Sequence, residues 1–374
     1  MSSFPEELYH EILLRLPVKS LLVCKSVCWN WYALISTSDF VETHIAIQEE
    51  KPILMLEGSH RNISIVYSIN YDSLASSSIG DAIDAIEMDY PFKSLGYGIV
   101  QLFGSANGLV CVWLFDNGGN RYCICLWNPA TGEYKEIPPL SAIRKYCHVQ
   151  LHAFGYDRKT DDYKLLMGVE APESKDSTLI HVYRLASNSW VTGKTIPCRF
   201  HYDQRSGVSS NGDLHWVPLG HDKYLLLSLD ISDENFKEMQ IPKELACNNA
   251  NQYLFLGVLE WCLCLLVSLH VDGQFEVRVM LEYGVRESWT KRYVIGHESL
   301  IHKQFFFRIV WSFENGKMLF LNGDGLVLYD LKYGSATELI LPNNPFLYFI
   351  HTKSYFESLV SPNSGTYNGG ETAQ

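Results

Sequence analysis

Hydrophobic positions in the first 46 residues recur at intervals of three and four, the period of an amphipathic α-helix. The first apolar stripe consists of Leu8, Ile12, Leu13 and Leu16. Pro5 suits the first turn of a helix and Pro17 cannot continue one, so the pattern predicts a helix over residues 5–15.

Shorter apolar runs follow, each preceded by a residue that can cap a helix. The candidate caps are Ser20, Ser26 and Asp39. The segment opened by Ser26 would carry Val27, Trp31, Leu34 and Ile35. These signals predict three or four helices within residues 1–46. A unit of this size cannot enclose all of its apolar side chains, so some should face a partner or the following domain.

After residue 51 the period changes to two, and short alternating strands separated by turn residues replace the helical pattern. One unit recurs: an apolar strand, a polar turn, a strand bearing an aromatic residue and, often, Ile-Pro. Its copies are marked by Asn128, Arg184, Asp230, Tyr283 and Asp330. The spacing of roughly fifty residues is typical of kelch-like propeller blades, and a weaker copy near Val66 brings the number to about six.

Inner strands are predicted between these hairpins, where Asn-Gly marks tight turns within residues 105–110, 209–216 and 312–318. Radial repetition protects the edges that a single long sheet would expose, so we expect a propeller-like domain. Pairing of a strand at 53–56 with one at 355–359 would close the ring. An irregular assembly of two sheets is the alternative.

The complete pattern predicts an α+β multidomain chain. A small helical domain would occupy residues 1–46, and a large all-β, propeller-like domain with about six blades would occupy residues 51–362. The segment 363–374 is rich in Gly, Ser, Thr and Asn and is expected to be a disordered tail. Residues 73–78 and 170–177 are expected to be surface loops.

Composition and charge narrow the choice of partners. Aromatic residues make up 13% of the 374 residues and charged residues 19%, which favours β-structure over helical bundles. The formal net charge is −12 and no long basic run occurs, so nucleic acid and anionic membranes are not expected as partners. No secretory signal is readable and Glu260 interrupts the apolar stretch at 254–269, so we expect an intracellular protein of the cytoplasm or nucleus.

Few residues suggest catalysis. The sequence contains no phosphate-binding glycine loop, nucleophile elbow or His-Glu-x-x-His motif. His215 beside Asp213 resembles an acid/base pair, but a packing role in a hairpin explains it better. The adjacent carboxylates of Asp161 and Asp162 fit a solvated turn. We therefore expect no catalytic residue.

The ten cysteines include two Cys-x-Cys pairs, Cys123 with Cys125 and Cys262 with Cys264. Alternate residues share one face of a strand, so this spacing fits core thiols better than a zinc site. Four tryptophans recur in the repeats and are expected to pack between strands: Trp127, Trp190, Trp216 and Trp289. We expect neither a metal nor a cofactor.

The order of residues in the helical segment resembles the F-box of plant F-box proteins. The matching residues are Phe4-Pro5-Glu6-Glu7-Leu8, Glu11-Ile12-Leu13-Leu14-Arg15-Leu16-Pro17-Val18-Lys19-Ser20-Leu21, Ser26-Val27-Cys28, Trp31, Leu34-Ile35 and Phe40. The chain departs from the family at Trp29, where a basic residue is usual, and at Val23 and Cys24, where a more basic or aromatic pair is usual.

This resemblance implies docking to a Skp-type adaptor and, through it, to the cullin and RING subunits of a ubiquitin ligase. By position, the residues that match the adaptor-facing part are Pro5, Leu8, Ile12, Leu13, Leu16, Pro17, Val18, Leu21, Val27, Trp31 and Leu34.

The strand segments resemble the F-box-associated domain of plant F-box/kelch-repeat and S-locus F-box-like proteins. The matching motifs include Asn128-Pro129-Ala130-Thr131-Gly132, Asn211-Gly212-Asp213-Leu214-His215-Trp216 and Tyr355-Phe356-Glu357-Ser358-Leu359-Val360-Ser361-Pro362. The resemblance covers almost the whole chain. It implies a non-catalytic substrate-recognition subunit that presents a target protein for ubiquitination and degradation.

If the repeated hairpins form the outer strands of blades, the connectors that follow them share one face of the ring. The target-binding candidates in these connectors are Arg144, Tyr146, His148, Arg199, His201, Tyr202, Lys243, His297 and Lys303. One alternative is a propeller enzyme with a helical cap, which needs acid/base residues converging at one mouth of the ring. Another is an adaptor-independent scaffold whose helical domain packs on the propeller and buries Leu8, Ile12 and Trp31.

Overall fold

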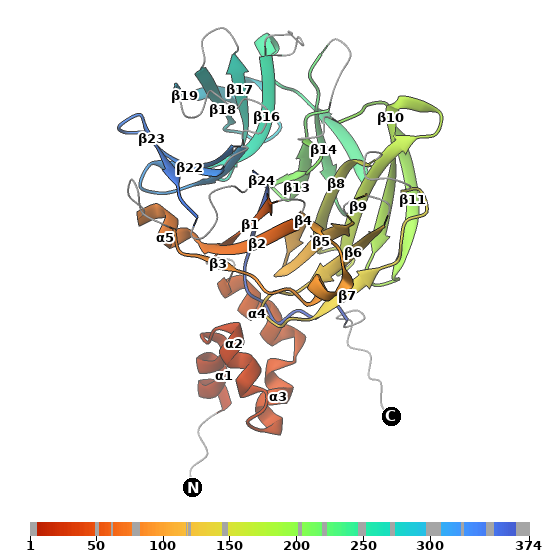
Figure 1. Ribbon diagram of the computed structural model, residues 1–374, viewed down its shortest axis with the longest axis vertical. Coiled ribbons are helices and arrows are strands. Elements are labelled where there is room, and N and C mark those ends of the chain that lie inside the picture. Colours follow the sequence, from red (N-terminus) through yellow and green to blue (C-terminus); the bar gives the residue numbers. More distant parts are fainter. Residues whose placement is uncertain are drawn as a thin grey trace.

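The computed structural model combines a small helical domain with a ring of β-sheets, and the helical domain projects from one side of the ring (Figure 1). It describes residues 6–48, 52–60, 63–76, 83–116, 118, 121–143, 149–200, 204–218, 223–245, 252–269, 274–296, 308–322, 325–341 and 348–363. The tail predicted at 363–374 lies outside these residues except for its first residue.

Four helices form the N-terminal domain in the described residues. They are α1 (Glu6–Leu14), α2 (Val18–Cys24), α3 (Trp29–Ile35) and α4 (Ser38–Gln48). Pro17 ends the first predicted helix and directly precedes α2. The interior of this domain contains large apolar side chains from all four helices: Leu13, Leu14, Val18, Leu21, Ile35, Phe40 and Val41.

The three predicted helix caps are wrong. Helix α2 begins at Val18, so Ser20 lies inside this helix and does not cap it. Ser26 does not open a helix, because its hydroxyl donates to the Val23 carbonyl at 2.7 Å and closes the end of α2. Helix α3 begins only at Trp29. At α4 the hydroxyl of Thr37, two residues before Asp39, accepts the backbone N–H of Phe40 at 3.3 Å.

Six four-stranded antiparallel sheets form the blades of the propeller, in agreement with the predicted number. The five blades that are continuous in sequence are β4 (Ile99–Ala106), β5 (Leu109–Phe115), β6 (Tyr122–Trp127) and β7 (Tyr134–Ile137); β8 (Val149–Asp157), β9 (Asp162–Ala171), β10 (Ser174–Arg184) and β11 (Ser189–Ile196); β12 (Val208–Ser210), β13 (Asp213–Trp216), β14 (Leu226–Asp230) and β15 (Asn235–Met239); β16 (Gln252–Leu259), β17 (Cys262–Leu269), β18 (Gln274–Met280) and β19 (Trp289–Ile295); and β20 (Arg308–Ser312), β21 (Lys317–Asn322), β22 (Gly325–Asp330) and β23 (Ser335–Leu339).

The sixth blade closes the ring by joining the two ends of the β-domain. Its strand order is β24 (Tyr348–Tyr355), β1 (Ile53–His60), β2 (Ile63–Asn70) and β3 (Ala85–Glu87). Ile53 lies opposite Tyr355 and Leu54 opposite Ser354. The predicted partner segment 355–359 is therefore wrong except for Tyr355, because an antiparallel partner of β1 runs from Tyr355 toward lower residue numbers.

The strands nearest the ring axis are β4, β8, β12, β16, β20 and β24, and most neighbours in this set contact one another. The repeated sequence unit supplies the two outer strands of a blade, as predicted. The Asn-Gly pairs supply the turns between inner strands. Asn107 and Gly108 both adopt positive φ, as do Asn211 and Gly212, which is the backbone that such a turn requires.

Two segments predicted as loops are regular. Residues 73–76 of the first belong to helix α5 (Tyr71–Ser76), at whose start the Asn70 side chain accepts the Asp72 N–H at 2.9 Å. Residues 77 and 78 lie outside the described residues. The second segment is the end of the β9–β10 hairpin, where Ser174 lies opposite Ala171. Three short 3-10 helices complete the described elements: η1 (Pro91–Leu95), η4 (Lys243–Leu245) and η5 (Arg286–Ser288).

Two of the four tryptophans fasten one blade to the next. The indole N–H of Trp190, in β11, donates to the Pro138 carbonyl at 2.7 Å, and that of Trp289, in β19, donates to the Gln240 carbonyl at 3.0 Å. Both acceptors follow the last strand of the preceding blade. Trp127 and Trp216 are buried in β6 and β13, so the four residues share a packing role but not one strand position.

Candidate functional site

The helical domain leaves apolar side chains exposed on its first helix. Leu8 is 49% exposed and Ile12 is 54% exposed. Residues four apart in a helix are neighbours on its surface, so the two side chains form one apolar patch on α1. Exposed apolar patches of this kind mark surfaces that another protein covers.

A second apolar group lies at the start of α3. Trp29 is 75% exposed and stacks on Tyr32, with 5.6 Å between the ring centroids. Val27 and Val23 are also exposed. The sequence drew attention to Trp29 only as a departure from the family pattern, and its spacing of three from Tyr32 is the signal that places both rings together.

The residues predicted to face an adaptor fall into three groups in the structure. Leu8, Ile12, Pro17 and Val27 are exposed, and Leu16, Trp31 and Leu34 are half-buried. Leu13, Val18 and Leu21 are buried in the interior of the domain. The prediction that these three face an adaptor disagrees with the structure, because their side chains pack in the apolar interior of the domain. Pro5 lies outside the described residues.

The C-terminal end of the β-domain lies against the helical domain. Leu359 and Val360 belong to the same apolar cluster as Phe40 and Val41 of α4. His44 of α4 is buried and its Nε2 lies 3.0 Å from the Leu16 carbonyl. Burial lowers the pKa of His44, an effect that the Leu16 carbonyl and the charge of Glu357 oppose. The helical domain is thus joined to the propeller by a packed apolar contact.

The Asn128 motif holds this end segment in place. The Asn128 amide donates to the carbonyls of Ser358 and Val360 at 3.0 and 2.7 Å, and its oxygen accepts the Ala130 N–H at 2.9 Å. Gly108 packs so closely that a Cβ there would lie 2.2 Å from the Ser358 hydroxyl. The two family motifs around Asn128 and Ser358 therefore form one structural clamp.

The face proposed for target binding is opposite to the helical domain. Successive strands of a blade run in opposite directions, so the connectors after the outermost strands β11 and β15 lie on the face where the innermost strands begin. Leu109 and Val360 lie on the other face, where the innermost strands end, together with the helical domain. Arg199 is exposed and pairs with Asp176 at 3.7 Å, and Lys243 is exposed at the start of η4. The remaining candidates lie outside the described residues: Arg144, Tyr146, His148, His201, Tyr202, His297 and Lys303.

His215 has the packing environment expected of a structural residue. It is fully buried, with Nδ1 3.2 Å from the Val208 carbonyl and Nε2 2.7 Å from the Tyr283 hydroxyl. The same hydroxyl donates to Asp213 at 2.7 Å. Both ring nitrogens are thus engaged, and the cluster fastens β13 to the segment after β18.

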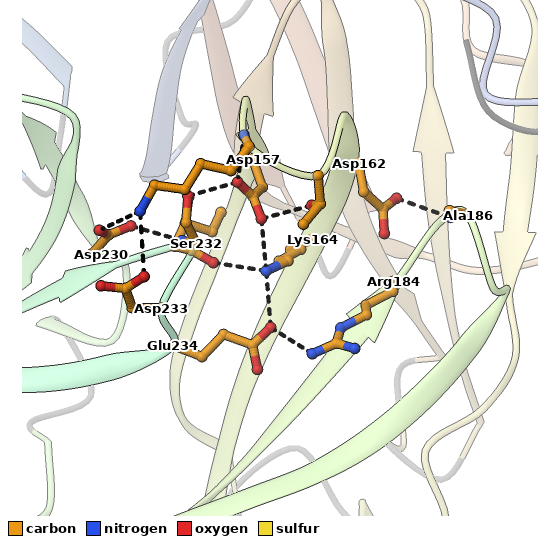
Figure 2. A network of polar contacts seen from close by, with 12 residues as sticks. Asp157, Asp162, Lys164, Arg184, Ala186, Asp230, Ser232, Asp233 and Glu234 are labelled. Carbon is orange, nitrogen blue, oxygen red and sulfur yellow. Dashed lines mark hydrogen bonds and ion pairs between the residues drawn. The ribbon is translucent and has the colours of Figure 1, made fainter. Parts of the chain in front are cut away.

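The predicted solvated turn is wrong for Asp162, which is buried, whereas Asp161 is half-buried. A buried ionic network lies next to these residues (Figure 2). Asp157 is fully buried and Lys164 nearly so, and Lys164 Nζ lies 2.9 Å from carboxylate oxygens of both Asp157 and Glu234. Glu234 also accepts from Arg184 at 2.9 Å. Asp162 is buried and accepts the Ala186 N–H at 2.9 Å. The network joins the β8–β11 blade to the β14–β15 turn.

Hydrogen bonds keep Asp157 ionised in this network. Burial acts to raise its pKa, but hydrogen bonds from Ser232, Thr160 and Lys164 outweigh it and hold the pKa below its usual range. The Ser232 hydroxyl donates at 2.6 Å, and Lys164 also donates to the Ile231 carbonyl at 2.9 Å. Ser232 and the Ile231 carbonyl belong to the β14–β15 turn of the next blade, so the network holds the two blades together.

Only one thiol of each Cys-x-Cys pair is buried in the core, and Cys123 and Cys262 are half-buried. Cys125 and Cys264 are buried, and Cys123 Sγ lies 3.6 Å from Cys125 Sγ. Within the described ranges, no group of three or more His, Cys, Asp or Glu side chains is arranged to hold a metal ion. None of the helices described is both long enough and apolar enough to span a membrane.

Comparison with known proteins agrees with this architecture. Residues 1–43 match the F-box domain and residues 38–362 match the F-box associated beta propeller domain. F-box protein CPR1 of Arabidopsis thaliana is 28% identical over 93% of this chain and 87% of its own length. An F-box/kelch-repeat protein of the same plant is 29% identical over 96% of both chains. The chain therefore belongs to the family of plant F-box proteins that carry an F-box associated beta propeller domain.

Proposed function

We propose that this chain is the substrate-recognition subunit of a cullin ubiquitin ligase. In this proposal the F-box binds a Skp-type adaptor, which connects it to the cullin and RING subunits. The propeller binds a target protein, which is then ubiquitinated and degraded. The chain carries out no bond chemistry itself and acts in the cytoplasm or nucleus by holding the target at high effective concentration.

The observation that carries the proposal is the exposure of Leu8 and Ile12 on α1. The helical domain uses other residues, among them Phe40 and Val41, to pack against the end of the propeller. The first-helix patch therefore stays available to an adaptor. An adaptor-independent scaffold would bury Leu8, Ile12 and Trp31, and of these only Trp31 is partly buried.

The clamp at Asn128 gives the proposal a geometric basis. Hydrogen bonds from Asn128 hold Ser358 and Val360 on a blade, and Val360 belongs to the apolar cluster that includes α4, so the F-box is fixed relative to the ring. A target bound on the opposite face would be held at a constant orientation to the adaptor. Orientation of this kind is what a non-catalytic subunit can contribute to transfer of ubiquitin to a lysine.

The test is direct binding of the purified chain to a purified Skp-type adaptor, with Ile12→Glu as the disrupting variant. Full burial of a side chain such as Ile contributes about 1.5–3 kcal/mol, and a carboxylate placed at an apolar contact adds a desolvation cost. We expect binding at least about 100-fold weaker, which corresponds to about 2.7 kcal/mol. Ile12 suits this test better than half-buried Leu16, whose replacement would also disturb the domain interior.

Ala46→Glu is the matched control, because Ala46 is an exposed apolar residue on α4. It should bind the adaptor like the wild type. Circular dichroism should show that both variants are folded. Absence of binding by the wild type, or equal binding by Ile12→Glu and Ala46→Glu, would contradict the proposed adaptor contact.

The target-binding face has its own test. Alanine replacement of Arg199 and Lys243 removes two exposed cations from connectors on the face opposite the F-box. We expect loss of target capture with unchanged adaptor binding. Unchanged capture by this variant would remove these two residues from the proposed site.

A further inference from the structure

The ring encloses a cavity of about 340 Å³ along its axis. All six innermost strands line it, including Ser105 on β4, Ala153 on β8 and Val258 on β16. A volume near 300 Å³ is at the lower end of the range for small-molecule sites. The cavity is thus large enough for a small organic molecule and is built from regular strands.

Two cationic side chains line this cavity, Arg308 on β20 and Lys353 on β24. Lys353 donates to the hydroxyl of Ser206. Other lining residues that can donate hydrogen bonds include Gln204 and Thr352. No carboxylate is among the described residues that line the cavity, although the chain as a whole has a net charge of −12. The charged side chains among the described lining residues are therefore both basic.

Two histidines next to the cavity experience this charge. His152 stacks on the lining residue Phe103 with 3.9 Å between ring centroids, and His351 lies two residues from Lys353. Burial, together with Lys353, Arg308 and further cationic neighbours, holds the pKa of His152 well below its usual range. Burial, Arg308 and Lys353 do the same for His351.

The surroundings of Lys353 disfavour its charged form. Burial, followed by the charge of Arg308, lowers the pKa of Lys353 to about 7. Two buried polar atoms beside the cluster, His152 Nδ1 and Gln101 Oε1, accept or donate no hydrogen bond among the described residues. The Gln101 amide donates to His351 Nε2 at 2.7 Å, which leaves that imidazole neutral. A bound anion would relieve the repulsion between the cations.

We propose that the axial cavity binds a small molecule through its phosphate group, with Arg308 and Lys353 as the charged ligands. A guanidinium presents a planar fork of N–H donors to two phosphate oxygens, and an ammonium adds a point charge. A phosphate dianion supplies two negative charges for two cations, whereas a single carboxylate supplies one. The cavity exceeds the needs of a bare phosphate, which favours a small organic phosphate.

The cavity opens toward the side of the ring that carries the F-box. Ser209, Val258, Val310 and Ser354 line both this cavity and a larger groove of about 1120 Å³. The groove also includes Arg15 at the end of α1 and other residues of the helical domain. A ligand would enter through this groove, so the site is separate from the proposed target-binding face.

The test is isothermal titration calorimetry on the full chain at constant ionic strength, with glycerol 3-phosphate and inorganic phosphate as separate ligands and chloride as the reference anion. We expect saturable binding of glycerol 3-phosphate to one site. If inorganic phosphate binds as well, the phosphate group alone is sufficient for binding. The proposal is supported whether glycerol 3-phosphate binds alone or inorganic phosphate binds too.

Lys353→Met and Arg308→Gln should each weaken binding at least about tenfold, because each removes a charged hydrogen-bond donor. Lys237→Met, which replaces an exposed lysine on β15, should bind like the wild type. Circular dichroism verifies that each variant is folded. The two cavity variants change different strands, so a folding defect in one leaves the other as a test.

No saturable binding of either phosphate by the wild type would overturn the proposal. Equal affinity in Lys353→Met, Arg308→Gln and the wild type would overturn the location. Tighter binding of a phosphoserine peptide than of glycerol 3-phosphate would overturn the assignment to a small molecule.

Discussion

Glu57, on β1, allows a quantitative test of the packing between the closing blade and its neighbour. Its side chain is 1% exposed and accepts the Ser64 hydroxyl at 2.9 Å. Burial raises the pKa of Glu57 from 4.5 to about 8, against the smaller opposing effect of the Ser64 hydrogen bond. The carboxyl group is therefore protonated in the folded protein at neutral pH.

The sign of the pH dependence follows from proton binding. Between pH 4.5 and pH 8 the folded protein retains a proton that the unfolded chain releases, so this group makes stability fall as the pH rises. Its full contribution is present below pH 4.5 and is lost by about pH 8. At pH 7 the loss amounts to about 3 kcal/mol, because each pH unit corresponds to 1.36 kcal/mol per proton.

Glu57→Gln tests this reasoning, because glutamine imitates the protonated carboxyl group and does not titrate. The free energy of unfolding is measured by urea denaturation of wild type and variant at pH 5, 6, 7 and 8. From pH 5 to pH 7 the stability of the variant relative to the wild type should increase by about 2.5 kcal/mol. Other titrating groups are common to both proteins and cancel in the difference.

Glu338→Gln, which changes an exposed glutamate on β23, is the control and should show no such increase. A difference between Glu57→Gln and the wild type that stays constant across this pH range would refute a protonated Glu57. A difference that shrinks as the pH rises would show that the sign is wrong.

Three further variants test the contacts between parts of the molecule. Lys164→Met leaves the buried carboxylate of Asp157 uncompensated and should lower the free energy of unfolding in urea by about 3–5 kcal/mol, whereas Lys159→Met at an exposed ion pair should leave it nearly unchanged. Gly108→Ala should destabilise the chain more than Gly212→Ala, since both glycines have φ near +80° but only a Cβ at position 108 meets Ser358; equal melting temperatures would contradict the clamp. Trp190→Phe removes the donor to the Pro138 carbonyl and should cost about 1–3 kcal/mol, and an unchanged urea midpoint would show that the bond adds nothing.

Features encoded by neighbouring residues could be predicted from the sequence. Asn107 with Gly108 specifies a tight turn whatever surrounds it, and the roughly fifty-residue spacing of the strand units specifies the number of blades. Local sequence signals gave wrong predictions where a few polar residues can either begin a helix, end one or form a loop. The polar residues of 73–78 predict a loop, yet Asn70 caps a short helix over 71–76. Ser26 resembles the start of a helix, yet its hydroxyl closes the preceding one.

Features that depend on contacts between blades could not be predicted. Trp190 and Pro138 are 52 positions apart, and Lys164 meets Glu234 only because adjacent blades stack. The sequence also gives no sign that Glu57 is buried, because the neighbouring blade that helps to cover it is distant in the chain. On the helical domain, an apolar stripe does not reveal which side chains face inward, so Leu13 and Ile12 were assigned to the same surface although only Ile12 is exposed.

The closing strand also sets an order of events during synthesis. Strand β24 must pair with β1, about 300 residues earlier in the chain, and Ser358 and Val360 complete the seat on which the F-box rests. The F-box therefore leaves the ribosome long before the segment that it packs against has been synthesised. The F-box can reach its final position only after every blade has been made, so a chain that stops before β24 would display an F-box with no fixed orientation to the blades.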